Sequence, residues 1–250
     1  MTKEKQKQTE LAKSVAAYAK SDIKISMIQL LNTFLPFLLL TFFAYQSFSF
    51  SIWLSLALSI LASGFVVRIF IIFHDCTHMS FFKKSKWNRL LGTVSGVITH
   101  FPFKKWRHDH IIHHATSGNL DKRGVGDIWV MTVEEYKAAS LWTKLAYRAY
   151  RNPIIMFGLG PLYLLLLDNR LNRKGAGRQE RWNTYLTNFV LAVIYAVLIW
   201  AAGWQAVLIV QVPMMYVAGV LGIWLFYVQH QFEESYYEHD EEWNYVHAAV

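Results

Sequence analysis

The fold is decided by residues 182–232, which read WNTYLTNFVLAVIYAVLIWAAGWQAVLIVQVPMMYVAGVLGIWLFYVQHQF. These 51 residues contain no Lys, Arg, Asp or Glu. About 20 apolar residues cross the hydrocarbon core of a bilayer as a helix, so the stretch is long enough for two spans. Residues 201–205, AAGWQ, interrupt it, with Gly as a helix breaker and Trp at interfacial depth. We therefore predict two membrane-spanning helices, near 185–202 and 206–228.

A second stretch without charged residues, residues 25–67, is interpreted in the same way. Its 43 residues are interrupted by QSFSFS at 46–51, which predicts spans near 27–47 and 52–73. The composition agrees, because 54% of the residues are hydrophobic and only 17% are charged, whereas soluble domains average about 25% charged residues. A single Cys excludes a disulfide framework. The predicted fold class is an all-α integral membrane protein with four transmembrane helices and a cytosolic helical cap.

The distribution of Lys and Arg predicts the orientation. Six of the 25 precede the first span, eighteen lie between Lys83 and Arg181, and Arg68 lies near the end of the second span. The two short turns contain none, so the positive-inside rule places the turns outside and the rest of the polar chain in the cytosol. We expect a multi-pass protein of the plasma membrane. Its net charge of +8 is then explained by topology and anionic lipid, and we expect no binding of nucleic acid.

The chain is predicted to form one domain over residues 1–250. It has a cytosolic N-terminus at 1–26, spans within 27–73, a cytosolic region at 74–184, spans within 185–228, and the start of a C-terminal cytosolic region at 229–250. The Lys-rich beginning lacks a small-residue cleavage pattern, so we expect it to stay attached. The apolar segments 90–103 and 152–167 are too short to span. Both are expected to lie at the interface as helices, and 152–167 has a re-entrant loop as its alternative.

Five of the ten His fall into two groups after the second span, HDCTH at 74–78 and HIIHH at 110–114. On a helix, His74 and His78 leave the same face. His110 faces both His113 and His114, which diverge from each other by about 100°. Imidazoles without thiolates suit iron, copper, nickel or zinc. Five exceed the three protein ligands of a mononuclear catalytic zinc, so the pattern indicates two metal ions or one unusually saturated ion.

Polar residues near these groups have less specific roles. Cys76 is expected only to pack. Asp75 and Asp109 either accept hydrogen bonds from imidazole N–H groups or cap helices. Three basic residues before the second group either hold a phospholipid head group or are ordinary positive-inside charge: Lys104, Lys105 and Arg107. Three polar residues after it are expected to order the loop through side-chain hydrogen bonds: Asn119, Asp121 and Asp127.

At these residues the sequence resembles the membrane fatty acid desaturase family, whose three histidine boxes have the forms HxxxH, HxxHH and HxxHH. His74 and His78 match the first box, and His110, His113 and His114 match the second. Three longer segments are similar to bacterial acyl-lipid desaturases of the delta-5 type: IFIIFHDCTHMSFF at 69–82, HHATSGNLDKRGVGDIWVMTVEEYKAA at 113–139 and GIWLFYVQHQFEESYYE at 222–238. A third box does not follow before residue 250, so the resemblance implies a sequence truncated ahead of it.

The resemblance implies a di-iron centre that uses O2 and two external electrons to place a cis double bond, at the delta-5 position, in acyl chains of membrane phospholipids. It implies ferredoxin or flavodoxin as the electron donor, docking on the basic cytosolic surface. His230, at the end of the last span, would be the additional ligand that such enzymes use outside their boxes. The alternative is a lone polar residue at a helix end.

Three other functions are consistent with parts of the sequence. A related membrane di-iron hydroxylase would use a similar histidine-rich site on alkyl chains or carotenoids. An intramembrane zinc protease is suggested by the likeness of HDCTH to H-E-x-x-H, but Asp75 stands where the Glu base is needed and the second group would be unused. An inactive fragment that binds lipid or metal would follow from the missing third box.

Overall fold

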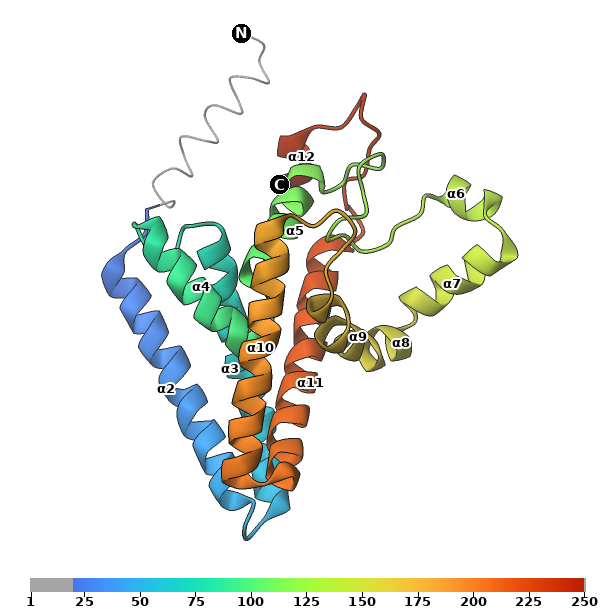
Figure 1. Ribbon diagram of the computed structural model, residues 1–250. Coiled ribbons are helices and arrows are strands. Elements are labelled where there is room, and N and C mark those ends of the chain that lie inside the picture. The colour runs from blue at the N-terminus through green and yellow to red at the C-terminus, as the bar shows by residue number, and fades with distance from the viewer. Residues whose placement is uncertain (1–19, 250) are drawn as a thin grey trace.

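The computed structural model describes residues 20–249, and within them the regular secondary structure is helical apart from one isolated β-bridge (Figure 1). Four helices in this range are long and apolar enough to cross a membrane: α2 (Ile23–Ser47), α3 (Ile52–Thr77), α10 (Arg178–Ala202) and α11 (Trp204–His230). The predicted all-α membrane fold is confirmed. Residues 1–19 of the expected N-terminal segment lie outside the described residues.

The ends of these helices show how short the connecting turns are. The Asp22 carboxylate caps α2 by accepting hydrogen bonds from the amides of Lys24 (2.8 Å) and Ile25 (3.1 Å), and Ser51 caps α3. The first turn occupies residues 48–51, so the facing ends of the predicted spans 27–47 and 52–73 are confirmed. In the second turn only Gly203 leaves the helix, since its φ of 83° suits glycine best. The predicted break at 201–205 was therefore too long.

Helix α3 lies at the centre of the bundle and packs against α2, α4 and α11. The largest apolar cluster joins Phe37 of α2, Val66 and Ile69 of α3, and Met214 of α11. The outward sides of α2 and α10 carry exposed large apolar residues, Trp200 among them. On a soluble protein such a surface would promote association, whereas on helices of this length it suits contact with lipid.

A helical hairpin beside α3 supports the second histidine group. It consists of α4 (Ser85–Thr99) and α5 (Phe103–Thr116), joined by a turn at His100, whose φ is 66°. Gly96 permits the close approach of α4, because a Cβ atom there would lie 2.5 Å from the carbonyl oxygen of Phe101 and 2.9 Å from the Phe73 ring. The segment 90–103 was predicted as one helix. Instead, α4 ends at Thr99 and Phe103 begins the returning helix, which brings α5 back toward the end of α3.

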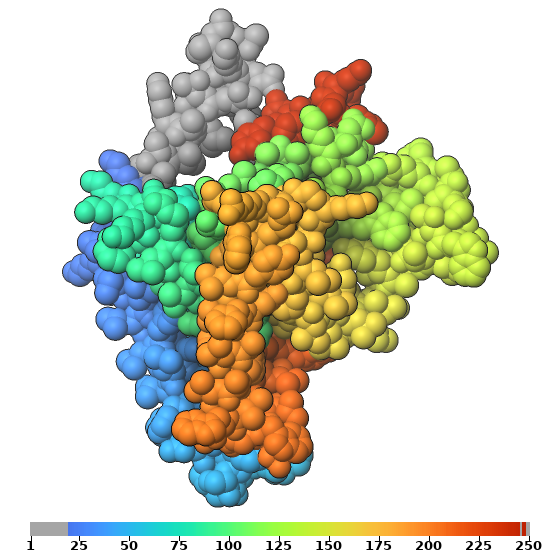
Figure 2. All heavy atoms as spheres, in the orientation of Figure 1, coloured from blue at the N-terminus to red at the C-terminus, as the bar shows by residue number. Residues whose placement is uncertain are grey.

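The rest of the central region forms an arm at the side of the bundle. It contains α6 (Val133–Ala138), α7 (Leu141–Arg151), α8 (Pro153–Gly158), α9 (Gly160–Leu166) and the short η1 (Asp168–Arg170). Helices α8 and α9 pack against α11, and residues 153–170 are bent by 59° from α7. Figure 2 shows α6 and α7 projecting beside the bundle. The described chain ends with α12 (Tyr245–Ala249) next to the histidine end of the bundle (Figure 1).

Candidate metal centre

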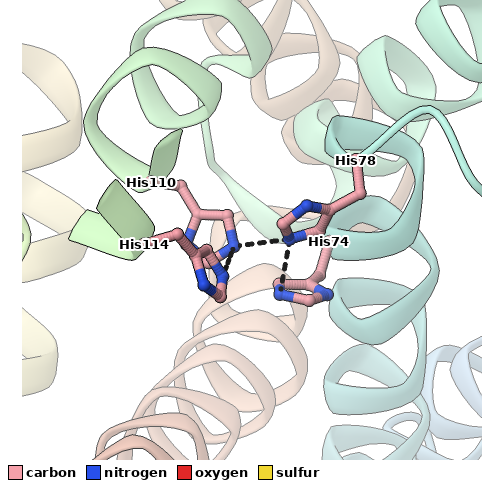
Figure 3. A group of neighbouring side chains, drawn as sticks. All are labelled: His74, His78, His110 and His114. Atoms are coloured by element: carbon pink, nitrogen blue, oxygen red, sulfur yellow. Dashed lines mark hydrogen bonds between the residues drawn. The ribbon is translucent and has the colours of Figure 1, made fainter. Parts of the chain in front are cut away.

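Four imidazoles from α3 and α5 converge in one group (Figure 3). His74 and His78 leave the same side of α3, with their Nε2 atoms 3.3 Å apart. His110 and His114 do the same on α5, at 3.0 Å. The two pairs meet through the Nε2 atoms of His78 and His110, which are 2.9 Å apart. One ligand nitrogen from each residue lies within 4.8 Å of every other, so this four-histidine group can hold a metal ion.

The surroundings of the four-histidine group keep its α5 members neutral. Burial and the neighbouring imidazoles, His114 first among them, lower the pKa of His110 to about 2. Burial, followed by His78 and His113, lowers the pKa of His114 to about 4. A neutral imidazole is the form that binds a metal ion, so both side chains are held in the ligand state.

Aromatic packing and one carboxylate orient these rings. The ring of His110 stacks on Trp106, with 4.2 Å between centroids and 24° between planes, and Trp106 in turn contacts Phe73 at 5.0 Å. The carboxylate of Asp75 lies 3.3 Å from Nδ1 of His74, which favours the first of the two roles expected for Asp75. Cys76 is buried against Phe73 in the adjacent apolar cluster, as predicted.

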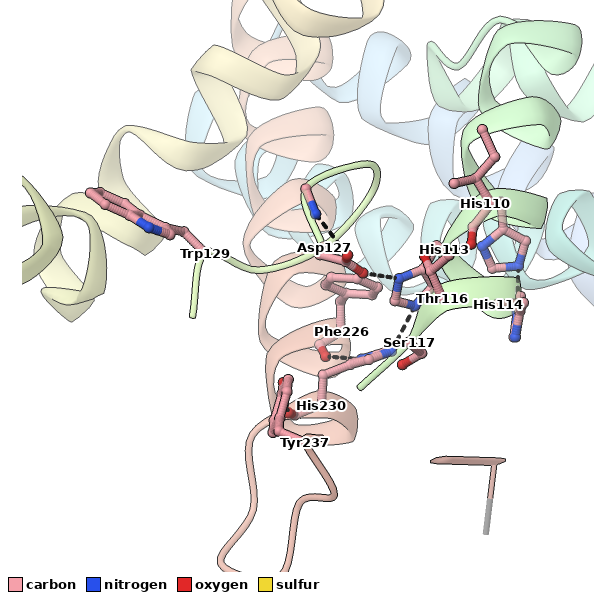
Figure 4. Close-up of polar contacts among 12 residues, drawn as sticks. His110, His113, His114, Thr116, Ser117, Asp127, Trp129, Phe226, His230 and Tyr237 are labelled. Carbon is pink, nitrogen blue, oxygen red and sulfur yellow. Dashed lines mark hydrogen bonds and ion pairs between the residues drawn. The ribbon is translucent and has the colours of Figure 1, made fainter. Parts of the chain in front are cut away.

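His113 belongs to a second group, because it leaves α5 in a different direction from His114 (Figure 4). Its Nε2 lies 2.8 Å from Nε2 of His230 at the end of α11. Its ring centroid is 6.1 Å from that of His110, so the predicted pairing of His110 with both neighbours holds only for His114. The structure thus divides the six predicted ligands into a group of four and the His113–His230 pair.

Hydrogen bonds fix the tautomers of the His113–His230 pair. Nδ1 of His113 lies 2.6 Å from Oδ1 of Asp127, and Nδ1 of His230 lies 2.9 Å from the carbonyl oxygen of Phe226. Both oxygens can only accept, so both Nδ1 atoms donate. In the neutral rings each Nε2 then carries a lone pair, and the two lone pairs face each other across 2.8 Å. Such an arrangement is repulsive until a cation lies against it, so the donor set fits a metal ion.

Asp127 is the site residue that sequence reasoning placed only in the loop. It does order the loop, because its second oxygen accepts a hydrogen bond from the amide of Gly124 (3.0 Å). Its first oxygen holds His113. Gly126, with a φ of 74°, brings the loop so close that a Cβ atom there would lie 3.2 Å from Cβ of His113. The sequence pattern that could have predicted this turn is the close spacing of Gly124, Gly126 and Asp127.

Neither role expected for Asp109 is correct. Its carboxylate lies within α5 and forms an ion pair with Arg173 at 2.7 Å. Arg173 also lies 3.2 Å from Glu180 in the first turn of α10. The reason is tertiary: the loop before α10 returns over α5 and supplies a partner for Asp109 that is distant in sequence. This link ties the helix carrying the second histidine group to the bundle.

The three basic residues before the second group are engaged by the protein. The Lys105 side chain is 6% exposed, and its ammonium donates to the carbonyl oxygen of Asp168 and lies 3.1 Å from the Asp168 carboxylate. Arg107 donates to the carbonyl oxygen of Thr77 at 2.9 Å, and Lys104 donates to Gln179 at 3.1 Å. The head-group role is therefore wrong for Lys105, whose charge is enclosed by Asp168.

The loop after the second group is fastened to the C-terminal segment. Asn119 donates to the Asp240 carboxylate at 2.7 Å, and Asp121 accepts from the Asp240 amide at 2.8 Å. A parallel bridge joins Asn119 and Glu238. The predicted ordering by Asn119 and Asp121 is confirmed. A small cleft opens here beside His113 and His230, and its other lining residues include Arg123 and Tyr237.

Helices long enough to span a membrane, with six histidines gathered at one end of their bundle, define a membrane protein of a histidine-rich class, and four of these histidines could hold a metal ion. Residues 51–249 match the family described as Fatty acid desaturase. The chain belongs to the fatty acid desaturase family, which is a family of oxidoreductases. The resemblance seen in the histidine boxes is thereby confirmed at the level of the family.

Individual relatives support this placement. A Bacillus subtilis protein named "Fatty acid desaturase" is 59% identical over 244 residues, which cover 98% of this chain and 69% of that protein. A Nostoc protein named "sn-1 acyl-lipid omega-3 desaturase (ferredoxin)" is 27% identical over 73% of this chain and 52% of its own length. A Synechocystis "sn-1 oleoyl-lipid 12-desaturase" is 37% identical over 34% of this chain and 23% of its own length. The delta-5 position and the expected truncation stay predictions.

Proposed function

We propose that this protein introduces a cis double bond, at the delta-5 position, into acyl chains of membrane lipids. The observation that carries the proposal is the convergence of six imidazoles, in two groups, at the end of an apolar helical bundle. The reaction takes two hydrogen atoms from the chain and two electrons from a donor, and with two protons it reduces one O2 to two water molecules. Relatives named as acyl-lipid desaturases support a lipid-linked substrate.

Two iron ions are the proposed cofactors. His74, His78, His110 and His114 would hold one ion, and His113 and His230 would contribute to the other. When bound, iron supplies the activation of O2 that an unactivated methylene group requires. In the His113–His230 pair both Nδ1 atoms are occupied as donors, so Nε2 is the atom that each ring would offer to the metal. Asp127 and Trp106 hold two of these rings in their orientations.

The position of the histidines suits a substrate dissolved in the bilayer. His74 and His230 lie in the last turns of α3 and α11, directly beyond apolar segments. An acyl chain can therefore reach the site from the hydrocarbon core without passing through water. We further propose that this end faces the cytosol at the plasma membrane, because the turns at the opposite end contain no Lys or Arg.

Ferredoxin or flavodoxin is the proposed electron donor. Two of the relatives carry ferredoxin in their names. Several basic side chains at the histidine end are exposed, including Lys83, Lys84 and Lys86 at the start of α4. Complementary charge steers acidic partners to such a surface, so electron transfer should weaken as ionic strength rises.

The test is lipid analysis of cells that express the protein. We expect new cis double bonds in phospholipid acyl chains, with their position given by mass spectrometry of derivatised esters. Replacing His78 or His113 by Ala should abolish them, whereas His247→Ala, outside both groups, should not. Hydroxylated chains without new double bonds would overturn desaturation in favour of the hydroxylase. Membrane insertion, followed by fractionation, must stay unchanged in every variant.

A second measurement concerns the metal alone. Purified protein should contain iron, and variants in either histidine group should lose part of it. A protein that binds no iron, cobalt or zinc after reconstitution would contradict the ligand assignment whatever the lipid analysis shows.

A further inference from the structure

Helix α7 has two unlike faces. Trp142 and Leu145 lie along one side and are 80% and 45% exposed. Lys144 and Arg148 leave α7 about 160° and 120° around the helix from Trp142, and their charges lie 5.9 Å and 5.8 Å from the centre of the Tyr136 ring. A surface helix of a water-soluble protein packs its apolar side against the core and exposes its charged side. In α7 the apolar side is exposed and the basic side packs on an aromatic ring.

The apolar face of α7 continues into helices that pack on a spanning helix. The chain passes directly from Arg151 through Asn152 into α8 and α9, which pack against the spanning helix α11. These two short helices expose Ile154, Leu159 and Tyr163. The arm in Figure 1 is therefore an extension of the lipid-facing surface of the bundle. Its composition, with Trp and Leu on one side and Lys and Arg on the other, is that of a helix lying in a membrane interface.

We propose that the α7 face formed by Trp142 and Leu145 docks into the lipid leaflet at the histidine end of the bundle. These two apolar side chains enter the region between head groups and acyl chains. Lys144 and Arg148 lie on the water side of the helix, within reach of lipid phosphates. The occupant of this surface is lipid, because the face is continuous with the spanning helices and is edged by positive charge.

Contacts in the C-terminal half of α7 join this surface to the His113–His230 pair. Trp129 lies two residues after Asp127, and its ring is 5.2 Å from that of Tyr147 and 5.8 Å from that of Tyr150 on α7. Arg151, the last residue of α7, donates to the side chain of Gln231 at 2.5 Å, next to His230. A leaflet that holds α7 therefore also sets the depth of the His113–His230 pair.

Site-directed spin labelling tests the proposal directly. The only cysteine, Cys76, is buried, so nitroxide labels will attach to introduced cysteines. We would label Trp142→Cys and Leu145→Cys on the apolar face and Lys144→Cys on the polar face as the matched control, in nanodiscs of phosphatidylethanolamine and phosphatidylglycerol. Collisions with dissolved O2 and with a water-soluble nickel chelate then report the depth of each label.

We expect the ratio of O2 to nickel collisions to be several-fold higher at 142 and 145 than at 144. Equal ratios at the three positions would overturn the proposal, because α7 would then stand in water. Protection of 142 and 145 from both reagents would also overturn it and would indicate cover by protein. Neither measurement uses iron or lipid oxidation, so failure here leaves the proposed desaturation untouched.

Discussion

Replacing Asp127 by Asn is the sharpest test of how the second histidine group works. The substitution keeps the size of the side chain and removes its charge. The hydrogen bond from Nδ1 of His113 to the carboxylate is 2.6 Å long, and the side chains are 5% and 14% exposed, so water cannot replace the lost interaction. In Asn the neutral amide accepts more weakly, and its NH2 group can turn toward His113 and reverse the tautomer.

The expected loss of metal affinity is estimated from comparable carboxylate–histidine pairs at metal sites. Removing such a partner costs about 10- to 100-fold in metal affinity, or about 1.4 to 2.7 kcal/mol. We would titrate metal-free protein in detergent with Co2+ and follow its absorption bands. The wild type should show binding at both groups. Asp127→Asn should weaken binding at the His113–His230 pair by this factor and leave the four-histidine group unchanged, and desaturation should fall in parallel.

Asp121→Asn is the matched control. Asp121 lies in the same loop, but its carboxylate contacts His239 at 2.9 Å and neither histidine group. It should bind Co2+ as the wild type does. Wild-type affinity at both groups in Asp127→Asn would refute the argument that this carboxylate sets the tautomer of His113.

Three further predictions concern stability and ligand orientation. Gly96→Ala should lower stability by about 1 to 3 kcal/mol in thermal unfolding, since its Cβ would lie 2.5 Å from a backbone oxygen, whereas Gly64→Ala has open space and should cost nothing. Burial, followed by the charge of Arg170, lowers the pKa of His100 from 6.5 to about 4. Between these pH values the unfolded chain binds a proton at His100 and the folded protein does not. As the pH falls from 6.5 to 4, the free energy of unfolding of the wild type should decrease by up to about 3 kcal/mol more than that of His100→Asn. Above pH 6.5 the two proteins should show the same pH dependence. Trp106→Leu should weaken Co2+ binding at the four-histidine group, and equal affinity would show that the stack on His110 is dispensable.

The spans were predictable because a helix that crosses a bilayer needs a minimum length, and stretches of that length without charged residues can be found in the sequence. Their ends were less so. Helix α10 starts at Arg178 rather than near 185, because its charged first turn lies outside the apolar window that marks a span. Gly203 alone breaks the second helical pair, since Ala202 and Trp204 on either side of it are compatible with helix.

The four-histidine group was predictable in part, since spacing of four residues places two imidazoles on one helix face. The sequence did not predict which neighbouring histidine would group with His110. His113 instead contacts His230 and Asp127, which lie elsewhere in the chain. The partner of Asp109 was hidden for the same reason, since Arg173 lies in a loop with no local signal. Local periodicity identifies the candidate ligands, and tertiary contacts determine which of the two histidine groups each one joins.

The two histidine groups also differ in when the growing chain can form them. The four-histidine group uses α3 and α5 alone and is complete in sequence by Thr116, whereas His113 and His230 are 117 residues apart. A nascent chain therefore has one full set of imidazoles before α10 and α11 have been translated. The His113–His230 pair forms only after the last spanning helix is inserted, so the second half of the centre cannot assemble until the bundle has closed.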